Sequence, residues 1–208
     1  QGGLLGALDD EDYFGWAVAG FGDLDADGVV DLAVGVDWDD DGGFNRGAVY
    51  VLLLHGNGTV KAEQKISSTQ GGLVGPLDGS DFFGKSVAAV GDVDGDGVVD
   101  LVVGAAEDAD GGSRVGAVYI LFMNTDGTVK SEQKISATTE DGLDASPVNA
   151  NHIGFSVGAL GDVDNDGIPD IAVGAPGDAD GGAVFVLLLN EDGTVKAQHK
   201  IGPNDGLE

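Results

Sequence analysis

The chain has 208 residues, of which 42% are hydrophobic and 38 are glycine. So much glycine excludes a helical bundle, because glycine costs a helix roughly 1 kcal/mol per residue and favours turns instead. The 37 acidic residues face nine basic ones, which gives a net charge of −28. A chain this negative repels nucleic acid and anionic membrane surfaces, so neither nucleic acid nor a membrane is expected as a partner. Cations are the expected partners.

The acidity comes almost entirely from aspartate, with thirty Asp and seven Glu. The short Asp side chain suits tight loops whose oxygens converge on an ion, although an acidic surface adapted to a high-salt habitat is the alternative. There is no cysteine, which excludes disulfides and thiolate sites. No apolar run approaches the ~18 residues of a membrane span. Because the chain opens on Gln1 without a signal segment, we expect a mature or excised piece of a longer protein.

Three tandem units fill the chain. An acidic motif that begins at Gly22 returns at Gly91 and Gly161, and a second motif, Gly-Thr-Val-Lys, returns at positions 58, 127 and 193. The predicted units are residues 1–69, 70–138 and 139–208.

Each unit reads as four short strands. In the first unit they cover residues 15–21, 31–36, 48–54 and 59–66, and an Asp-rich loop joins the first two. The first strand is small and apolar and the fourth alternates and is polar, which is the gradient expected from the crowded axis to the solvent edge of a propeller blade. The sequence therefore predicts an all-β fold of β-propeller blades, with three four-stranded antiparallel blades per chain.

The Asp-rich loop carries carboxylates at relative positions 1, 3, 5 and 9, with Gly at position 6. Four like charges in nine residues call for a hard cation, and oxygen ligands with a loop carbonyl at position 7 favour Ca²⁺. Plain Asp-Gly turns are the alternative, against which the threefold repetition argues. The predicted ligands of three Ca²⁺ ions per chain are Asp23, Asp25, Asp27, Val29 and Asp31; Asp92, Asp94, Asp96, Val98 and Asp100; and Asp162, Asp164, Asp166, Ile168 and Asp170.

An EF-hand would need a bidentate Glu at position 12 of this loop. That position holds Val34, Val103 and Val173, in apolar strands, so the helical EF-hand is excluded.

A calcium loop inside a β-hairpin resembles the FG-GAP repeats of the integrin α-subunit propeller and its bacterial relatives. The matching elements are Phe14-Gly15, Phe83-Gly84, Gly174-Ala175-Pro176, and the Gly-Ala-Val-Tyr runs that begin at Gly47 and Gly116. Departures are Ile153-Gly154 for Phe-Gly, residues 35–37 and 104–106 for Gly-Ala-Pro, and Phe185 for Tyr.

The resemblance implies that the calcium loops lie on one face and that partners bind on the other. Strand alternation gives the same partition and places Trp38, Phe44, Arg46 and Arg114 on the opposite face. The Asp108/Asp110 and Asp178/Asp180 pairs also lie there; we expect solvated turn residues, with second metal sites as the alternative.

Catalysis is not indicated. His55, His152 and His199 lie in different parts of different units and are expected to be exposed polar residues. The predicted function is a noncatalytic calcium-binding module for extracellular or cell-surface adhesion, with a protein or glycan ligand. The alternatives are a purely architectural self-assembling unit, or a hydrolase or lyase that uses paired carboxylates.

The count of units predicts self-association. Propellers close with ~4–8 blades, and this chain starts and ends at the same point of its repeat, so two chains would form a six-bladed homodimer. The rival prediction is a fragment of a longer propeller, seven-bladed by resemblance to the integrin head.

Overall fold

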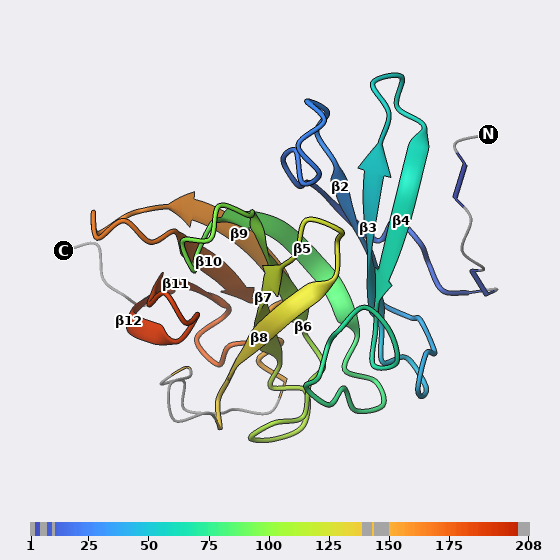
Figure 1. Cartoon of the computed structure of the whole chain (residues 1–208). Coiled ribbons are helices and arrows are strands. Elements are labelled where there is room, and N and C mark those ends of the chain that lie inside the picture. Colours follow the sequence, from blue (N-terminus) through green and yellow to red (C-terminus); the bar gives the residue numbers. More distant parts are fainter. Residues whose placement is uncertain (1–2, 5–7, 10, 139–142, 144–149, 204–208) are drawn as a thin grey trace.

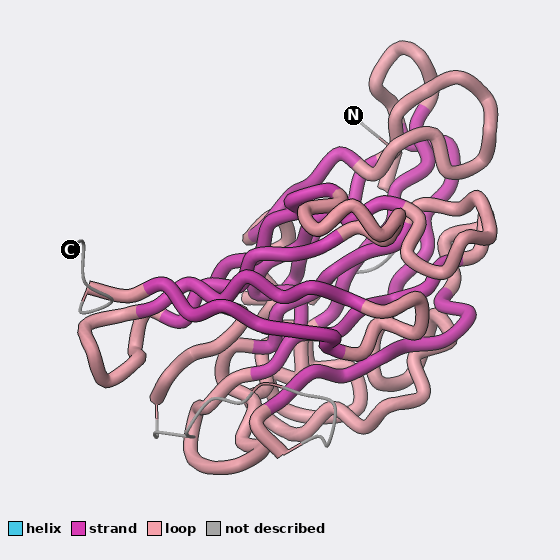
Figure 2. The backbone as a smooth tube through the Cα atoms, turned by 90° about the vertical axis from the view of Figure 1, so that its left-hand side faces the viewer, coloured by secondary structure: helices cyan, strands magenta, loops and turns pink. Residues whose placement is uncertain are grey.

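Three separate sheets make up the structure. The computed structural model describes residues 3–4, 8–9, 11–138, 143 and 150–203. Within these ranges every regular element is a β-strand (Figures 1 and 2), and no helix of a length and apolarity that would cross a bilayer occurs. The strands form three four-stranded antiparallel sheets, which confirms the predicted all-β architecture of three blades.

Each sheet is a meander in which consecutive strands pair. The first sheet contains β1 (Ala17–Gly20), β2 (Leu32–Val36), β3 (Ala48–Leu54) and β4 (Val60–Ile66). The second sheet contains β5 (Phe83–Gly91), β6 (Asp100–Ala105), β7 (Ala117–Met123) and β8 (Val129–Ser136). The third sheet contains β9 (Ser156–Gly161), β10 (Asp170–Ala175), β11 (Ala183–Leu189) and β12 (Val195–Ile201). The unit boundaries at 69/70 and 138/139 stay a prediction.

The sheets pack face to face in chain order. Strand β5 packs against β1 and β2, and β9 packs against β5 and β6, so the small first strands adjoin one another. One apolar core lies between the first and second sheets and another between the second and third. The second sheet is thus covered on both faces, and all of β7 is buried. This burial explains why the third strand of a unit is a continuous apolar run rather than an alternating one.

A short parallel bridge also joins neighbouring sheets. Gly47 pairs with Phe83, and Gly116 pairs with Ile153. Glycine is required here: Gly47 has φ +83°, and a Cβ on it would lie 2.0 Å from the carbonyl oxygen of Phe83. Strand β1 begins at Ala17 rather than at the predicted residue 15, and β9 begins at the equivalent Ser156, whereas β5 extends back to Phe83.

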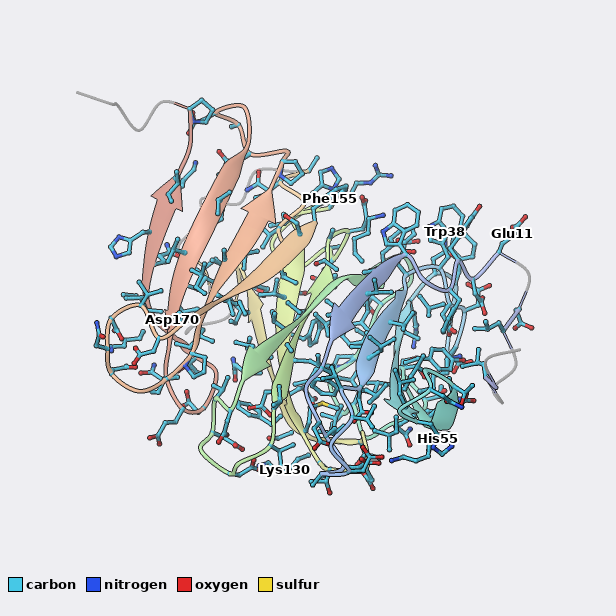
Figure 3. All side chains as sticks on the ribbon, turned by 90° about the horizontal axis from the view of Figure 1, so that it is seen from above. Glu11, Trp38, His55, Lys130, Phe155 and Asp170 are labelled. Carbon is cyan, nitrogen blue, oxygen red and sulfur yellow. The ribbon has the colours of Figure 1, made fainter. Side chains whose placement is uncertain are left out.

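The two ends of the sheets carry different side chains (Figure 3). His55, Lys130 and Asp170 lie at the end formed by the Asp-rich loops, whereas Glu11, Trp38 and Phe155 lie at the opposite end. The partition expected from strand alternation is therefore present, and it separates two candidate sites.

Candidate calcium loops and the opposite face

The first carboxylate of each acidic loop folds the loop around itself. Asp23 accepts hydrogen bonds from the backbone N–H groups of Asp27 and Gly28, both at 2.9 Å. Asp92 and Asp162 accept the equivalent bonds from residues four and five positions later. The loop is a turn in which successive carboxylates are brought together.

Three acidic clusters result. Their ligand-type oxygens lie within 4.8 Å of one another, a spacing that one cation can span. The clusters are Asp23, Asp25 and Asp27; Asp92, Asp94 and Asp96; and Asp162, Asp164 and Asp170. In the first, Asp25 Oδ1 is buried without a hydrogen-bond partner among the described residues. A buried, unsatisfied carboxylate oxygen in an all-oxygen cluster fits a hard cation such as Ca²⁺.

The ninth loop residue has a second role that the spacing did not reveal. Buried Asp31 accepts the N–H of Leu24 through Oδ2 and the N–H of Leu54 through Oδ1, both at 2.9 Å. Asp100 and Asp170 make the same two contacts in their sheets. This aspartate ties the loop to the end of the third strand. Burial raises the pKa of Asp100 to about 6, against the lowering effect of its two backbone hydrogen bonds.

The predicted carbonyl ligands are placed differently from the carboxylates. The N–H groups of Val29, Val98 and Ile168 each donate to the aspartate two positions earlier, at 2.9 Å. Ligation by their carbonyl oxygens stays a prediction.

A lysine from the fourth strand sits over each loop. Lys196 Nζ lies 2.6 Å from an oxygen of both Asp164 and Asp166. Lys61 bridges Asp25 and Asp27, and Lys130 bridges Asp94 and Asp96, in the same way. The hydrogen bond from the lysine lowers the pKa of the fifth loop residue in each sheet, which is Asp27, Asp96 or Asp166. Each cluster therefore carries an internal cation that partly offsets its charge.

The same strand carries a second lysine, four residues on, that binds the opposite end of the sheet. Lys134 Nζ lies 2.7 Å from both Asp108 and Asp110. Lys65 bridges Asp39 and Asp41, and Lys200 bridges Asp178 and Asp180. The expectation of solvated turn residues is wrong for Asp108 and Asp178, which are buried and paired with lysine, whereas the side chains of Asp110 and Asp180 are 44% and 53% exposed. The signal was present in the sequence as Lys-x-x-x-Lys in every fourth strand.

An aromatic pocket of about 250 Å³ lies on the face opposite the calcium loops. It is lined by Trp16, Trp38, Phe82, Lys85, Glu107 and Arg114. Lys85 Nζ lies 3.9 Å from the Trp16 ring centroid and 3.0 Å from buried Asp37, whose pKa burial raises despite this partner. Of the residues predicted for this face, Trp38 and Arg114 line the pocket, and Phe44 is exposed and lines a second pocket that shares Trp38.

The histidines are not grouped. His55 and His199 are exposed, as expected. His152 is not simply exposed: it is half-buried, with Nδ1 3.1 Å from Glu107 Oε1.

Comparison with known proteins agrees with these features. Residues 92–173 match the FG-GAP-like repeat family. The chain is 33% identical over 188 residues to integrin alpha-5 of Xenopus laevis, which covers 86% of this chain and 15% of that protein. It is 30% identical over 163 residues to integrin alpha-3 of Cricetulus griseus, which covers 78% of this chain and 14% of that protein. The chain thus spans about one seventh of the length of these relatives. With three antiparallel blades, repeated acidic loops and these matches, it is an FG-GAP repeat protein similar to the β-propeller region of integrin α-subunits.

Proposed function

We propose that this chain is a noncatalytic, calcium-binding β-propeller module that acts in adhesion or ligand binding outside the cell. The observation that carries the proposal is the set of three acidic clusters, one at the same place in each sheet, with oxygens within 4.8 Å of one another. Three Ca²⁺ ions would add six positive charges and change the formal charge from −28 to about −22. Loops of this kind fill where free calcium is near millimolar, which is why an extracellular or cell-surface location follows.

Calorimetric titration with calcium tests the proposal. The wild-type chain should bind three ions, and Asp94→Asn should bind two, because that substitution removes one charge from a single cluster. Asp126→Asn is the matched control: Asp126 holds a turn at the same end of the second sheet through Thr128, outside the clusters. A wild-type chain that shows no saturable binding at millimolar calcium would refute the calcium site.

The aromatic pocket supports ligand binding on the opposite face. Aromatic rings beside an arginine and a glutamate offer stacking surfaces together with hydrogen-bond donors and acceptors, as protein and glycan ligands require. The side chain of Arg114 is 65% exposed and that of Glu107 is 22% exposed, and Arg114 Nε lies 3.0 Å from Glu107, so the arginine is the more accessible of the two groups.

Intrinsic fluorescence gives a direct test. The chain has two tryptophans, Trp16 and Trp38, and both line this pocket. Titration with oligosaccharides and with peptides should change the tryptophan emission in a saturable way for a true ligand, and Arg114→Ala should weaken that response. A ligand that binds the chain without changing the emission, or equally well to Arg114→Ala, would place the binding site elsewhere.

A further inference from the structure

The outer face of the third sheet is exposed at positions whose equivalents in the second sheet are buried. In the second sheet, Val118 is fully buried against the third sheet, but its equivalent Val184 is 42% exposed. The same contrast holds for three further pairs, buried in the second sheet and exposed in the third: Val90 and Leu160, Val93 and Val163, and Ile135 and Ile201. These four exposed residues define the outer face. They form an apolar sheet face, and the equivalent face of the second sheet is the one that packs against the third sheet.

The first sheet, at the opposite end of the stack, also has an uncovered face. Leu77 is 1% exposed between the first and second sheets, whereas its equivalent Leu8 is 36% exposed. Phe83 is buried, whereas its equivalent Phe14 is partly exposed. The first sheet thus presents the surface that its two successors bury against a preceding sheet.

A backbone segment at this end already has the conformation for docking. We call residues 11–14 the receiving segment, equivalent to 80–83 and 150–153. Tyr13 has φ +55°, Phe82 +55° and His152 +53°. The N–H groups of Phe82 and Phe83 donate to carbonyls of the preceding sheet, at 3.2 and 2.9 Å. The N–H groups of Tyr13 and Phe14 have no partner in the described part of the chain, so two oriented donors remain.

The third sheet differs from the others in the loop that would meet such donors. Four residues separate Gly43 from Ala48, and four separate Gly112 from Ala117, but Gly182 precedes Ala183 directly. The missing residues are the ones that supply the acceptor carbonyls and the bridging glycine in the first two sheets. A contact made by the third sheet must therefore depend on its apolar face.

We propose that two copies of this chain associate head to tail, with the outer face of each third sheet packed on the first sheet of the other copy. One chain carries both complementary surfaces, and two identical contacts close a ring of six sheets with twofold symmetry, within the range of propeller sizes. The contact continues the packing already seen between consecutive sheets. Because the loop bridge is missing, it is weaker than the internal interfaces, and dissociation on dilution follows.

Light scattering in millimolar calcium tests the proposal. The wild-type chain should have twice its chain mass of 20.8 kDa at micromolar concentration. Val184→Glu should raise the dimer dissociation constant on the order of 100-fold, because it buries an unpaired carboxylate in the contact. Val74→Glu is the control, since Val74 is 85% exposed on a connection of the middle unit. Circular dichroism and calcium binding verify that both variants are folded.

A gain-of-contact variant completes the test. Insertion of Phe-Asn-Arg-Gly between Gly182 and Ala183 restores the loop of the first sheet and should tighten the dimer. A wild-type monomer at all concentrations, a dimer that Val184→Glu leaves intact, open polymers, or an inserted loop without effect on the dissociation constant would each overturn the proposal. A monomer would indicate that further blades of a longer polypeptide cover these faces.

Discussion

At the scale of single residues, the aspartates of one loop divide into two groups. The carboxylates at positions 3 and 5 are at least partly exposed and paired with a lysine, whereas the carboxylate at position 9 is buried and accepts two backbone N–H groups. The first group has the freedom to bind a cation. The second ties the loop to the third strand of its sheet, and in the third sheet this residue, Asp170, also belongs to the acidic cluster.

This division predicts different effects on stability in chelator. Asp100→Ala should lower the free energy of unfolding by about 2–3 kcal/mol, because the buried N–H groups of Val93 and Met123 lose their acceptor. Asp94→Ala should leave it within about 0.5 kcal/mol, because a partly exposed ion pair contributes little. Urea denaturation in chelator measures both. Equal losses in the two variants would contradict the assignment.

The lysine over each loop predicts a competition with calcium. Lys130→Gln should tighten calcium binding in the second loop about 2- to 5-fold, because the metal no longer displaces an ammonium group from Asp94 and Asp96. Lys200→Gln is the charge-matched control, since Lys200 pairs with Asp178 and Asp180 at the opposite end of the third sheet. Calorimetry should show no change for the control. Weaker binding by Lys130→Gln would show that this lysine orders the loop instead.

At the scale of elements, the parallel bridge couples one sheet to the next. It forms where a loop between the second and third strands of one sheet meets the beginning of the following sheet, and a glycine permits the close approach of the two backbones. The repeated motifs predicted the strands to within about two residues. They did not predict this bridge, because it depends on contacts between units rather than on any pattern within one.

Two glycines with the same backbone conformation isolate the contribution of the bridge. Gly47 and Gly58 have φ of +83° and +80°, but only at Gly47 would a Cβ collide with a neighbouring backbone. Gly58→Ala should cost about 1 kcal/mol for the left-handed conformation alone. Gly47→Ala should cost at least about 2 kcal/mol more, through displacement of the second sheet. Thermal unfolding compares them, and equal costs would mean that the bridge adds nothing to stability.

At the scale of the whole molecule, acidic groups are buried between sheets as well as gathered in loops. Asp81 lies at the junction of the first and second sheets, and burial, together with the charge of Asp108, raises its pKa to about 6. The ordinary Asp value is ~3.9. The charged form is thus disfavoured in the folded state, so the protonated group favours folding fully below pH ~4, and that stability is lost as the pH rises through 6.

The pH dependence of stability in chelator should therefore change when this charge is removed. Asp81→Asn should raise the free energy of unfolding at pH 7 by roughly 2 kcal/mol and flatten its dependence between pH 4 and 7. Asn can still accept the N–H of Asp78, which Asp81 accepts at 2.7 Å. Asp126→Asn, in an exposed turn, should change stability at pH 7 by less than about 0.5 kcal/mol. An unchanged pH profile in Asp81→Asn would exclude a titrating Asp81.

The sequence predicted local structure better than long-range pairing. Spacing alone placed the acidic loops between the first and second strands of each sheet, since three copies of one pattern reinforce one another. The aromatic pocket was only half predicted: Trp38 was expected on its face, but Lys85 and Trp16 come from equivalent positions of different units and have no repeated signal. Pairing of Lys134 with Asp108 was missed because it joins segments that are distant in the sequence.

The paired lysines of the fourth strands also affect how this protein behaves in a crowded solution. Strands β4, β8 and β12 are the outermost of their sheets, so backbone groups on their outer edges could template the addition of a foreign strand; in β8 the N–H of Val129 is already bonded to the Gly71 carbonyl. Each carries two lysines, four residues apart, held by aspartates at both ends of the sheet. A strand added at this edge would have to bury or displace these charges. The charged side chains on these strands thus protect the edges of the sheets against the strand-by-strand growth that leads to aggregation.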